Sequence, residues 1–163
     1  MAHYVMSDIH GEADRFHAML EKIHFSTDDT LYILGDVIDR GPDGISLMRK
    51  IMAAQNMVML LGNHEYMMLD YMKPEPDTIA IRRWNKNGNR PTLDAYLKLK
   101  AKEQQEILDH LRSLSTHLEV EINGMRCMAS QEKMSTTRSG TDRRLILRTR
   151  FPVDSLSSDI PRC

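Results

Sequence analysis

The stretch Gly35-Asp36-Val37-Ile38-Asp39-Arg40-Gly41 follows directly on the apolar run Leu31-Tyr32-Ile33-Leu34. An apolar run that stops at a glycine indicates a buried strand that ends in a loop, so two carboxylates and an arginine lie where this strand ends. Ligands of open α/β sheets bind outside the carboxyl ends of the strands. Carboxylates suit a divalent cation and a guanidinium suits an anion. Taken alone, the stretch also fits a surface turn with an Asp39–Arg40 ion pair.

Two other apolar runs end in the same way. Tyr4-Val5-Met6 stops at Ser7-Asp8-Ile9-His10-Gly11, and Val58-Met59-Leu60-Leu61 stops at Gly62-Asn63-His64-Glu65. Three consecutive strands therefore carry metal-capable or acid–base side chains at the same end, which core packing alone does not require. The sequence predicts a single site built from three strand ends.

The segments between these runs have the pattern of crossover helices. Apolar residues recur at helical spacing over residues 12–24 and 45–54. Strands and helices that alternate in this way form right-handed βαβ units. We therefore expect an α/β fold with a partly parallel sheet and crossover helices.

The second half of the chain has a different pattern. A short apolar helix is predicted over residues 66–72, and it stops at Pro74 and Pro76. A second amphipathic helix is predicted over residues 103–114. Alternating residues over 118–129, with Asn123-Gly124 between them, predict a β-hairpin.

The blocks SDIHG, GDVIDRG and GNHE together resemble the calcineurin-like metallophosphoesterases. They are most similar to the phosphoprotein phosphatase branch, which includes bacterial serine/threonine phosphatases and diadenosine tetraphosphate hydrolases. The resemblance covers residues 3–125 and implies a β-sandwich flanked by helices. We expect an incomplete metallophosphoesterase domain over residues 1–130, with a helical cap at about residues 74–115. Residues 131–163 are expected to form a divergent, poorly packed tail.

The resemblance also implies a centre with two divalent cations. Asp8, His10 and Asp36 would hold the first ion, and Asp36 and Asn63 the second, with Asp36 as the bridge. Oxygen and nitrogen ligands of this kind favour Mn, Fe or Zn over Ca²⁺. The family supplies two later histidines to the second ion. Gln131 falls near the first of these positions and no histidine follows His117, so we expect an incomplete second site in a chain that lacks the C-terminal half.

Four residues are assigned to substrate binding and catalysis. Arg40 would bind the phosphoryl oxygens in a fork, with Asn63 beside it. A protonated His64 would donate to the leaving oxygen, and Asp39 would orient its imidazole. His64, Asp39 and Arg40 are predicted to be catalytic, and Arg40 and Asn63 to bind the substrate.

The remaining polar candidates have simpler interpretations. In the family, a Trp and an Asn-Gly segment line the substrate edge of the cap, which suggests Trp84, Asn87 and Arg90, but we favour a solvated loop for this segment. The histidines that no carboxylate motif accompanies are expected to be surface or hydrogen-bonded residues. They are His3, His17, His24, His110 and His117.

The predicted function is metal-dependent hydrolysis of phosphate monoesters, with phosphoserine or phosphothreonine in proteins as the substrate. A dinucleoside polyphosphate such as diadenosine tetraphosphate is the alternative. A third hypothesis is a weakly active or non-catalytic remnant that binds phosphate. The expected partner is a phosphorylated protein or a small phosphate ester.

Composition excludes several other classes. The 163 residues hold 22 basic and 23 acidic side chains, so no strong field attracts nucleic acid or an anionic membrane. Two cysteines, Cys127 and Cys163, make no disulfide framework, which favours a reducing cytoplasm. No apolar window approaches the length of a membrane span, and we expect no signal peptide.

Overall fold

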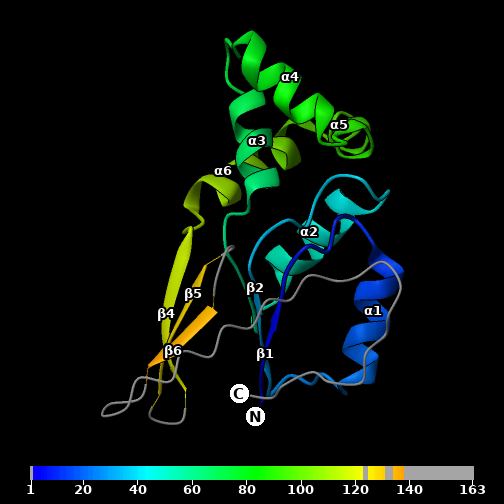
Figure 1. Cartoon of the computed structure of the whole chain (residues 1–163). Helices are drawn as coiled ribbons and strands as arrows, with labels where there is room; N and C mark the ends of the chain where they lie inside the picture. The colour runs from blue at the N-terminus through cyan, green and yellow to red at the C-terminus, as the bar shows by residue number, and fades with distance from the viewer. Residues whose placement is uncertain (1, 123–124, 131–133, 138–163) are drawn as a thin grey trace.

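The structure is a computed structural model that describes residues 2–122, 125–130 and 134–137. The predicted Asn123-Gly124 turn, Gln131 and most of the predicted tail lie outside the described residues. Within the described ranges, the chain forms two sheets and six helices (Figure 1).

The first three strands form a parallel sheet. They are β1 (His3–Met6), β2 (Thr30–Ile33) and β3 (Met57–Met59), in the order β1-β2-β3. Helix α1 (Ala13–Lys22) connects β1 to β2, and α2 (Gly44–Ala53) connects β2 to β3. The predicted α/β fold with crossover helices is therefore confirmed. Because sequential parallel strands are neighbours, their carboxyl ends meet at one edge of the sheet.

A second sheet is antiparallel. It consists of β4 (His117–Ile122), β5 (Met125–Ser130) and β6 (Met134–Thr137), in the order β4-β5-β6. The first two strands are the predicted hairpin. Strand β6 lies beyond residue 130, so the sheet continues past the point where we expected the tail to begin, although the domain boundary itself stays a prediction.

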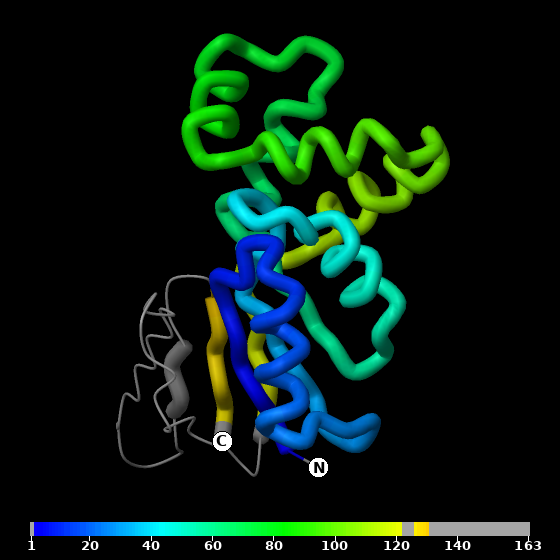
Figure 2. Tube along the Cα trace, turned by 90° about the vertical axis from the view of Figure 1, so that its right-hand side faces the viewer, coloured from blue at the N-terminus to red at the C-terminus, as the bar shows by residue number. Residues whose placement is uncertain are grey.

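The two faces of β2 contact different layers. Leu31 and Ile33 belong to the large core that includes residues of α1 and α2. The alternate residues Tyr32 and Leu34 pack with Cys127 and other apolar residues of the second sheet. The parallel sheet is thus covered on both faces, by helices on one and by the antiparallel sheet on the other (Figure 2). This double burial explains why its strands are continuous apolar runs.

Four helices rise beyond the carboxyl ends of the parallel strands, at the top of Figure 1. They are α3 (Asn63–Tyr71), α4 (Thr78–Lys86), α5 (Arg90–Tyr96) and α6 (Ala101–Ser113). Helix α3 begins three residues before the predicted helix start, so Asn63 and His64 lie in its first turn. In the part of the chain that the structure describes, no helix has the length and apolarity to cross a membrane.

Candidate metal and phosphate site

The loops at the three strand ends have an unusual backbone. Six non-glycine residues of the described chain have positive φ, and five of them lie in these loops: Asp8, His10, Asp36, Asp39 and Arg40. A non-glycine residue in this region costs roughly 1–3 kcal/mol and persists only where surrounding contacts enforce it. The loops are therefore held in shape by their neighbours.

His10 has the hydrogen bonding expected of a metal ligand. Its Nδ1 lies 3.2 Å from the carbonyl oxygen of Ile38. A carbonyl only accepts, so Nδ1 carries the proton and the lone pair of Nε2 is available. That Nε2 is 3.9 Å from Oδ1 of Asp8. Burial lowers the pKa of His10 below 6.5, although the Ile38 carbonyl opposes the shift. The lowered pKa and the proton on Nδ1 suit a neutral imidazole that binds a cation through Nε2.

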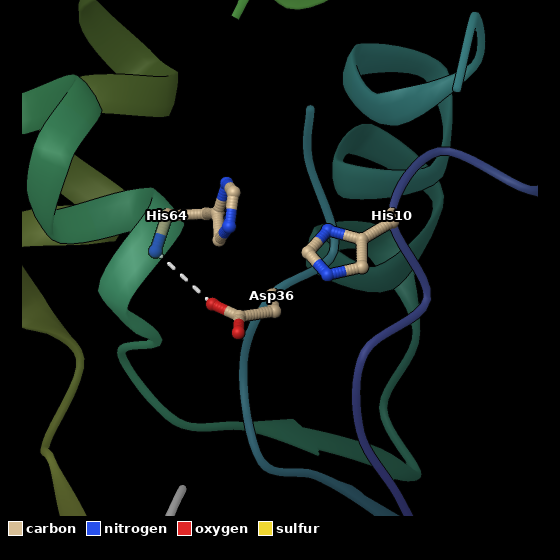
Figure 3. Close-up of side chains that lie close together, drawn as sticks. All are labelled: His10, Asp36 and His64. Carbon is tan, nitrogen blue, oxygen red and sulfur yellow. Dashed lines mark hydrogen bonds between the residues drawn. The ribbon is translucent and has the colours of Figure 1, made fainter. Parts of the chain in front are cut away.

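Asp36 lies between His10 and His64, and the three side chains point toward one another (Figure 3). One potential ligand atom from each lies within 4.8 Å of the others, and all three residues are buried. The backbone N–H of His64 donates to Oδ1 of Asp36 at 3.0 Å, so the N-terminus of α3 faces this carboxylate.

This group differs from the predicted ligand sets. It contains His64, which we assigned to acid catalysis, and it does not include Asp8. Asp8 is adjacent to it and accepts a hydrogen bond from Ser7 at 2.6 Å. Asn63 is exposed in the first turn of α3. The predicted residues thus gather at one edge of the sheet, whereas their roles as ligands stay predictions.

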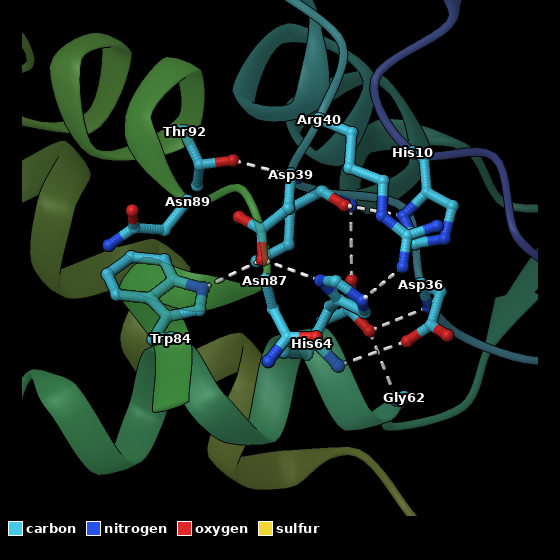
Figure 4. Close-up of polar contacts among 12 residues, drawn as sticks. His10, Asp36, Asp39, Arg40, Gly62, His64, Trp84, Asn87, Asn89 and Thr92 are labelled. Atoms are coloured by element: carbon cyan, nitrogen blue, oxygen red, sulfur yellow. Dashed lines mark hydrogen bonds and ion pairs between the residues drawn. The ribbon is translucent and has the colours of Figure 1, made fainter. Parts of the chain in front are cut away.

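The contacts of His64 argue against a role as ligand. Arg40 Nη2 lies 3.3 Å from its Nε2, and Asp39 Oδ2 lies 2.7 Å from its Nδ1. Because a guanidinium only donates, Nε2 must accept and the proton must sit on Nδ1. The positively charged guanidinium of Arg40, which lies beside Nε2, also repels a metal cation from that nitrogen. His64 is therefore held between the Asp39 carboxylate and the Arg40 guanidinium, which is compatible with the predicted role in proton transfer (Figure 4).

Asp39 is fully buried and is held by the cap helices. Its Oδ2 accepts from Trp84 Nε1 at 2.7 Å as well as from His64, and its backbone N–H donates to Thr92 Oγ1 at 2.8 Å. Within the described chain, Asp39 Oδ1 is a buried oxygen without a hydrogen-bond partner. The surface-turn alternative required an ion pair between Asp39 and Arg40. The carboxylate of Asp39 instead bonds to Trp84 and His64.

The two interpretations of the Trp84 segment need correction. Residues up to Lys86 are helical, so the solvated loop is wrong for them. Trp84 is 0% exposed, so it has no surface with which to line the substrate edge. Asn87 donates to the carbonyl of Arg83, and Arg90 pairs with Asp94 while its side chain is 83% exposed. Local polarity suggested a loop because the buried partner of the indole lies 45 positions earlier.

Glu65 is a structural residue of the site that sequence reasoning missed. Its carboxylate accepts backbone N–H groups from the GDVIDRG loop at Asp36, Val37 and Ile38, and one from Gly62. Burial and the nearby Asp36 carboxylate raise the pKa of Glu65 to about 7, against the effect of these N–H groups. Glu65 is the last residue of the GNHE block, so the block contained a signal for it. Its role could not be inferred from the sequence, because its partners lie 27 to 29 positions earlier in the chain.

Gly62 allows the two loops to meet. A Cβ at this position would lie 2.3 Å from the Asp36 nitrogen and 2.4 Å from Oε2 of Glu65. No side chain fits there without displacing the Asp36 loop. The glycine of GNHE is therefore required for close approach of two strand ends.

Comparison with known proteins identifies the class of protein that carries this site. The family model of the calcineurin-like phosphoesterases matches residues 1–160. The chain belongs to this family, whose members are metal-dependent hydrolases.

Individual relatives carry a more specific name. A protein named symmetrical bis(5'-nucleosyl)-tetraphosphatase from Delftia acidovorans is 38% identical over 114 residues, which are 69% of this chain and 37% of the relative. One of the same name from Wigglesworthia glossinidia brevipalpis is 42% identical over 71 residues, 42% of this chain and 26% of the relative. The chain thus spans about a third of the length of these curated relatives.

Solved structures of similar proteins are also known. A metallophosphoesterase from Sphaerobacter thermophilus has a TM-score of 0.48 at 21% identity, covering 76% of this chain and 44% of that one. A putative diadenosine tetraphosphatase has a TM-score of 0.48 at 18% identity, covering 71% of this chain and 48% of that one.

Proposed function

We propose that this chain takes part in the hydrolysis of a dinucleoside polyphosphate at the edge of the parallel sheet. The buried cluster of His10, Asp36 and His64, with Arg40 beside it, is the observation that carries the proposal. The choice of substrate is supported by the relatives named symmetrical bis(5'-nucleosyl)-tetraphosphatase. No relative reported above supports the phosphoprotein substrate that we first expected.

The residues fit a divalent cation. His10 presents an unprotonated Nε2, and the carboxylates of Asp8 and Asp36 lie around it, so we assign these residues to a first ion. Asp36 and Asn63 remain our assignment for a second ion, and Mn, Fe or Zn suits this donor set. Bound cations of this kind polarise a phosphoryl group and lower the pKa of water.

The protein residues supply binding and proton transfer. Arg40 is exposed and its guanidinium reaches the mouth of the cluster, where it suits the non-bridging oxygens of a phosphate. When Arg40 turns to the phosphate, Nε2 of His64 is free to take up a proton from solvent, and the imidazolium so formed would donate that proton to the leaving oxygen. Asp39 fixes the opposite nitrogen and stabilises the charged ring.

The test compares substrates on the 163-residue chain. We expect Mn²⁺-dependent conversion of diadenosine tetraphosphate to two molecules of ADP, which ion-exchange chromatography measures. We expect little release of phosphate from a phosphoserine peptide. Asp36→Asn serves as the inactive control. Preferential hydrolysis of the phosphopeptide would restore the protein phosphatase hypothesis. Equal rates in the parent and in Asp36→Asn would remove this site from the reaction.

A further inference from the structure

The Asp39–Arg40 pair is bound by a single segment of the cap. Three hydrogen bonds join residues 84–92 to this pair: from the Trp84 indole to the Asp39 carboxylate, from the Asp39 N–H to Thr92 Oγ1, and from the Arg40 N–H to the Gly88 carbonyl. Their lengths are 2.7, 2.8 and 2.9 Å. We call Trp84, Gly88 and Thr92 the cap clamp; Figure 4 labels Trp84 and Thr92 beside Asp39.

The backbone of the pair explains why a clamp is needed. Asp39 and Arg40 have φ values of 72° and 67°, a conformation that L residues rarely adopt. Two consecutive residues of this kind relax unless other contacts hold them. The two backbone N–H groups that this conformation presents are those that Thr92 and Gly88 accept. Gly88 itself lies close to Arg40, since a Cβ there would be 3.2 Å from Arg40 Cγ.

The clamp also reaches the imidazole through Asp39. Trp84 and His64 donate to the same oxygen of Asp39, and both donors are almost completely buried. The indole N–H has no alternative position, because the ring is 0% exposed and lies within the large core cluster, where Tyr71, at a centroid distance of 4.9 Å, is only one of its neighbours. The indole therefore determines where Oδ2 lies, and Oδ2 determines which nitrogen of His64 carries the proton.

We propose that the α4–α5 segment positions the Asp39–His64–Arg40 group through the cap clamp, with Trp84 and Thr92 as positioning residues for the reaction. The inference rests on the proposed function for its meaning in catalysis. The geometry predicts that loss of either contact loosens the Asp39–His64 hydrogen bond without removing a metal ligand.

The first measurement does not depend on activity. In the ¹⁵N-labelled 163-residue chain loaded with diamagnetic Zn²⁺, His64 should give a slowly exchanging Nδ1–H resonance, assigned with His64→Gln. Trp84→Phe and Thr92→Val should lose this resonance or exchange it faster. Thr92→Ser keeps the hydroxyl acceptor and should retain it. Tyr71→Leu removes a packing neighbour of the indole without touching Asp39 and should also retain it.

The second measurement uses turnover of diadenosine tetraphosphate with Mn²⁺. Trp84→Phe and Thr92→Val should lower kcat by about tenfold or more while KM stays within about threefold, because proton transfer and not binding is impaired. Zinc content measured by mass spectrometry should be unchanged. Thr92→Ser should restore kcat.

The outcomes separate this inference from the proposed function. A parent chain without turnover contradicts the proposed function, and the His64 resonance still decides the clamp. A resonance retained in both Trp84→Phe and Thr92→Val overturns the clamp. Equal loss of the resonance in Tyr71→Leu would also overturn the clamp, because Trp84 would then act only as a core residue. A parent chain in which His64 carries its proton on Nε2 would overturn it as well. If Trp84→Phe does not fold, the contrast between Thr92→Val and Thr92→Ser decides.

Discussion

At the scale of single residues, the site separates the binding of cations from the binding of phosphate. Asp36 lies within the metal-capable group, whereas Arg40 contacts His64 through a guanidinium that repels cations. The two residues are adjacent in one loop but should respond differently to substitution. Their difference can be measured without a known substrate.

We expect Arg40→Ala to weaken the binding of inorganic phosphate about 10- to 100-fold, because the charge-assisted hydrogen bonds of the guanidinium are lost. Mn²⁺ affinity should change little. Asp36→Asn should instead lower Mn²⁺ affinity and remove nearly all metal-dependent turnover. Calorimetry with each ligand measures both, and Arg112→Ala, a surface arginine paired with Asp109, is the control. Loss of Mn²⁺ binding in Arg40→Ala would contradict our assignment of Arg40.

Glu65 predicts an effect on stability. Glu65→Gln replaces one acceptor oxygen by an N–H₂ group that faces backbone N–H groups of the Asp36 loop or of Gly62. Buried donors left unpaired cost about 1–3 kcal/mol, so the free energy of unfolding should fall by about that amount. Urea denaturation measures the change. The exposed Glu75→Gln makes the same change of charge and should have little effect. Equal stabilities of the two variants would contradict the role of Glu65.

At the scale of elements, the turn before β2 holds the start of β1. The buried carboxylate of Asp29 accepts from the backbone N–H of Ala2 and from the N–H and hydroxyl of Ser26. These contacts lower the pKa of Asp29 below its ordinary value of 3.8, and the hydrogen bond from Ala2 has the largest effect. The turn lies at the end of the strands opposite to the site, so it tests the scaffold alone.

A depressed carboxyl pKa gives a defined dependence on pH. Folding favours the ionised form of Asp29, because the pKa of this carboxyl is lower in the folded chain than in the unfolded chain. The contribution of Asp29 to stability is therefore complete above pH 3.8, and it is lost as the pH falls through the lower pKa of the folded state. Asp29→Asn should therefore be less stable than the parent at neutral pH, and the difference should shrink below pH 3.8. Urea midpoints across pH measure this. The exposed neighbour Asp28→Asn should show no such dependence, and a difference that grows in acid would contradict the prediction.

At the scale of the whole molecule, the two ions of the proposed centre are unequally supported. Our assignment gives the first ion Asp8, His10 and Asp36 and the second ion only Asp36 and Asn63. Affinity for a cation rises with the number of protein ligands that are already in place. The proposed centre should therefore fill its two positions in sequence.

We expect the 163-residue chain to retain about one divalent ion after gel filtration, measured by inductively coupled plasma mass spectrometry, and to turn over slowly. Fusing residues 1–130 to the remaining C-terminal part of the Delftia relative should raise metal content and rate together. The same fusion with Asp36→Asn is the control. Two tightly held ions and full activity in the present chain would contradict the prediction and point to further ligands.

Much of the fold was predictable because its signals are local. The apolar runs that end at Gly35 and Gly62 and the helical spacing of residues 12–24 and 45–54 predicted the parallel sheet and both crossover helices. The start of α3 was missed because Asn63 and His64 are polar. Their helical conformation depends on acceptors such as Asp36, to which the His64 N–H donates.

The sequence by itself determined which residues gather at the edge of the sheet, because consecutive parallel strands must present their carboxyl ends together. Only the tertiary structure decided how those residues are held. Glu65 bonds to a loop 27 to 29 positions earlier, and Trp84 to a carboxylate 45 positions earlier. Such contacts leave no periodic trace in the sequence. They arise because buried polar groups must find partners wherever the folded chain brings them.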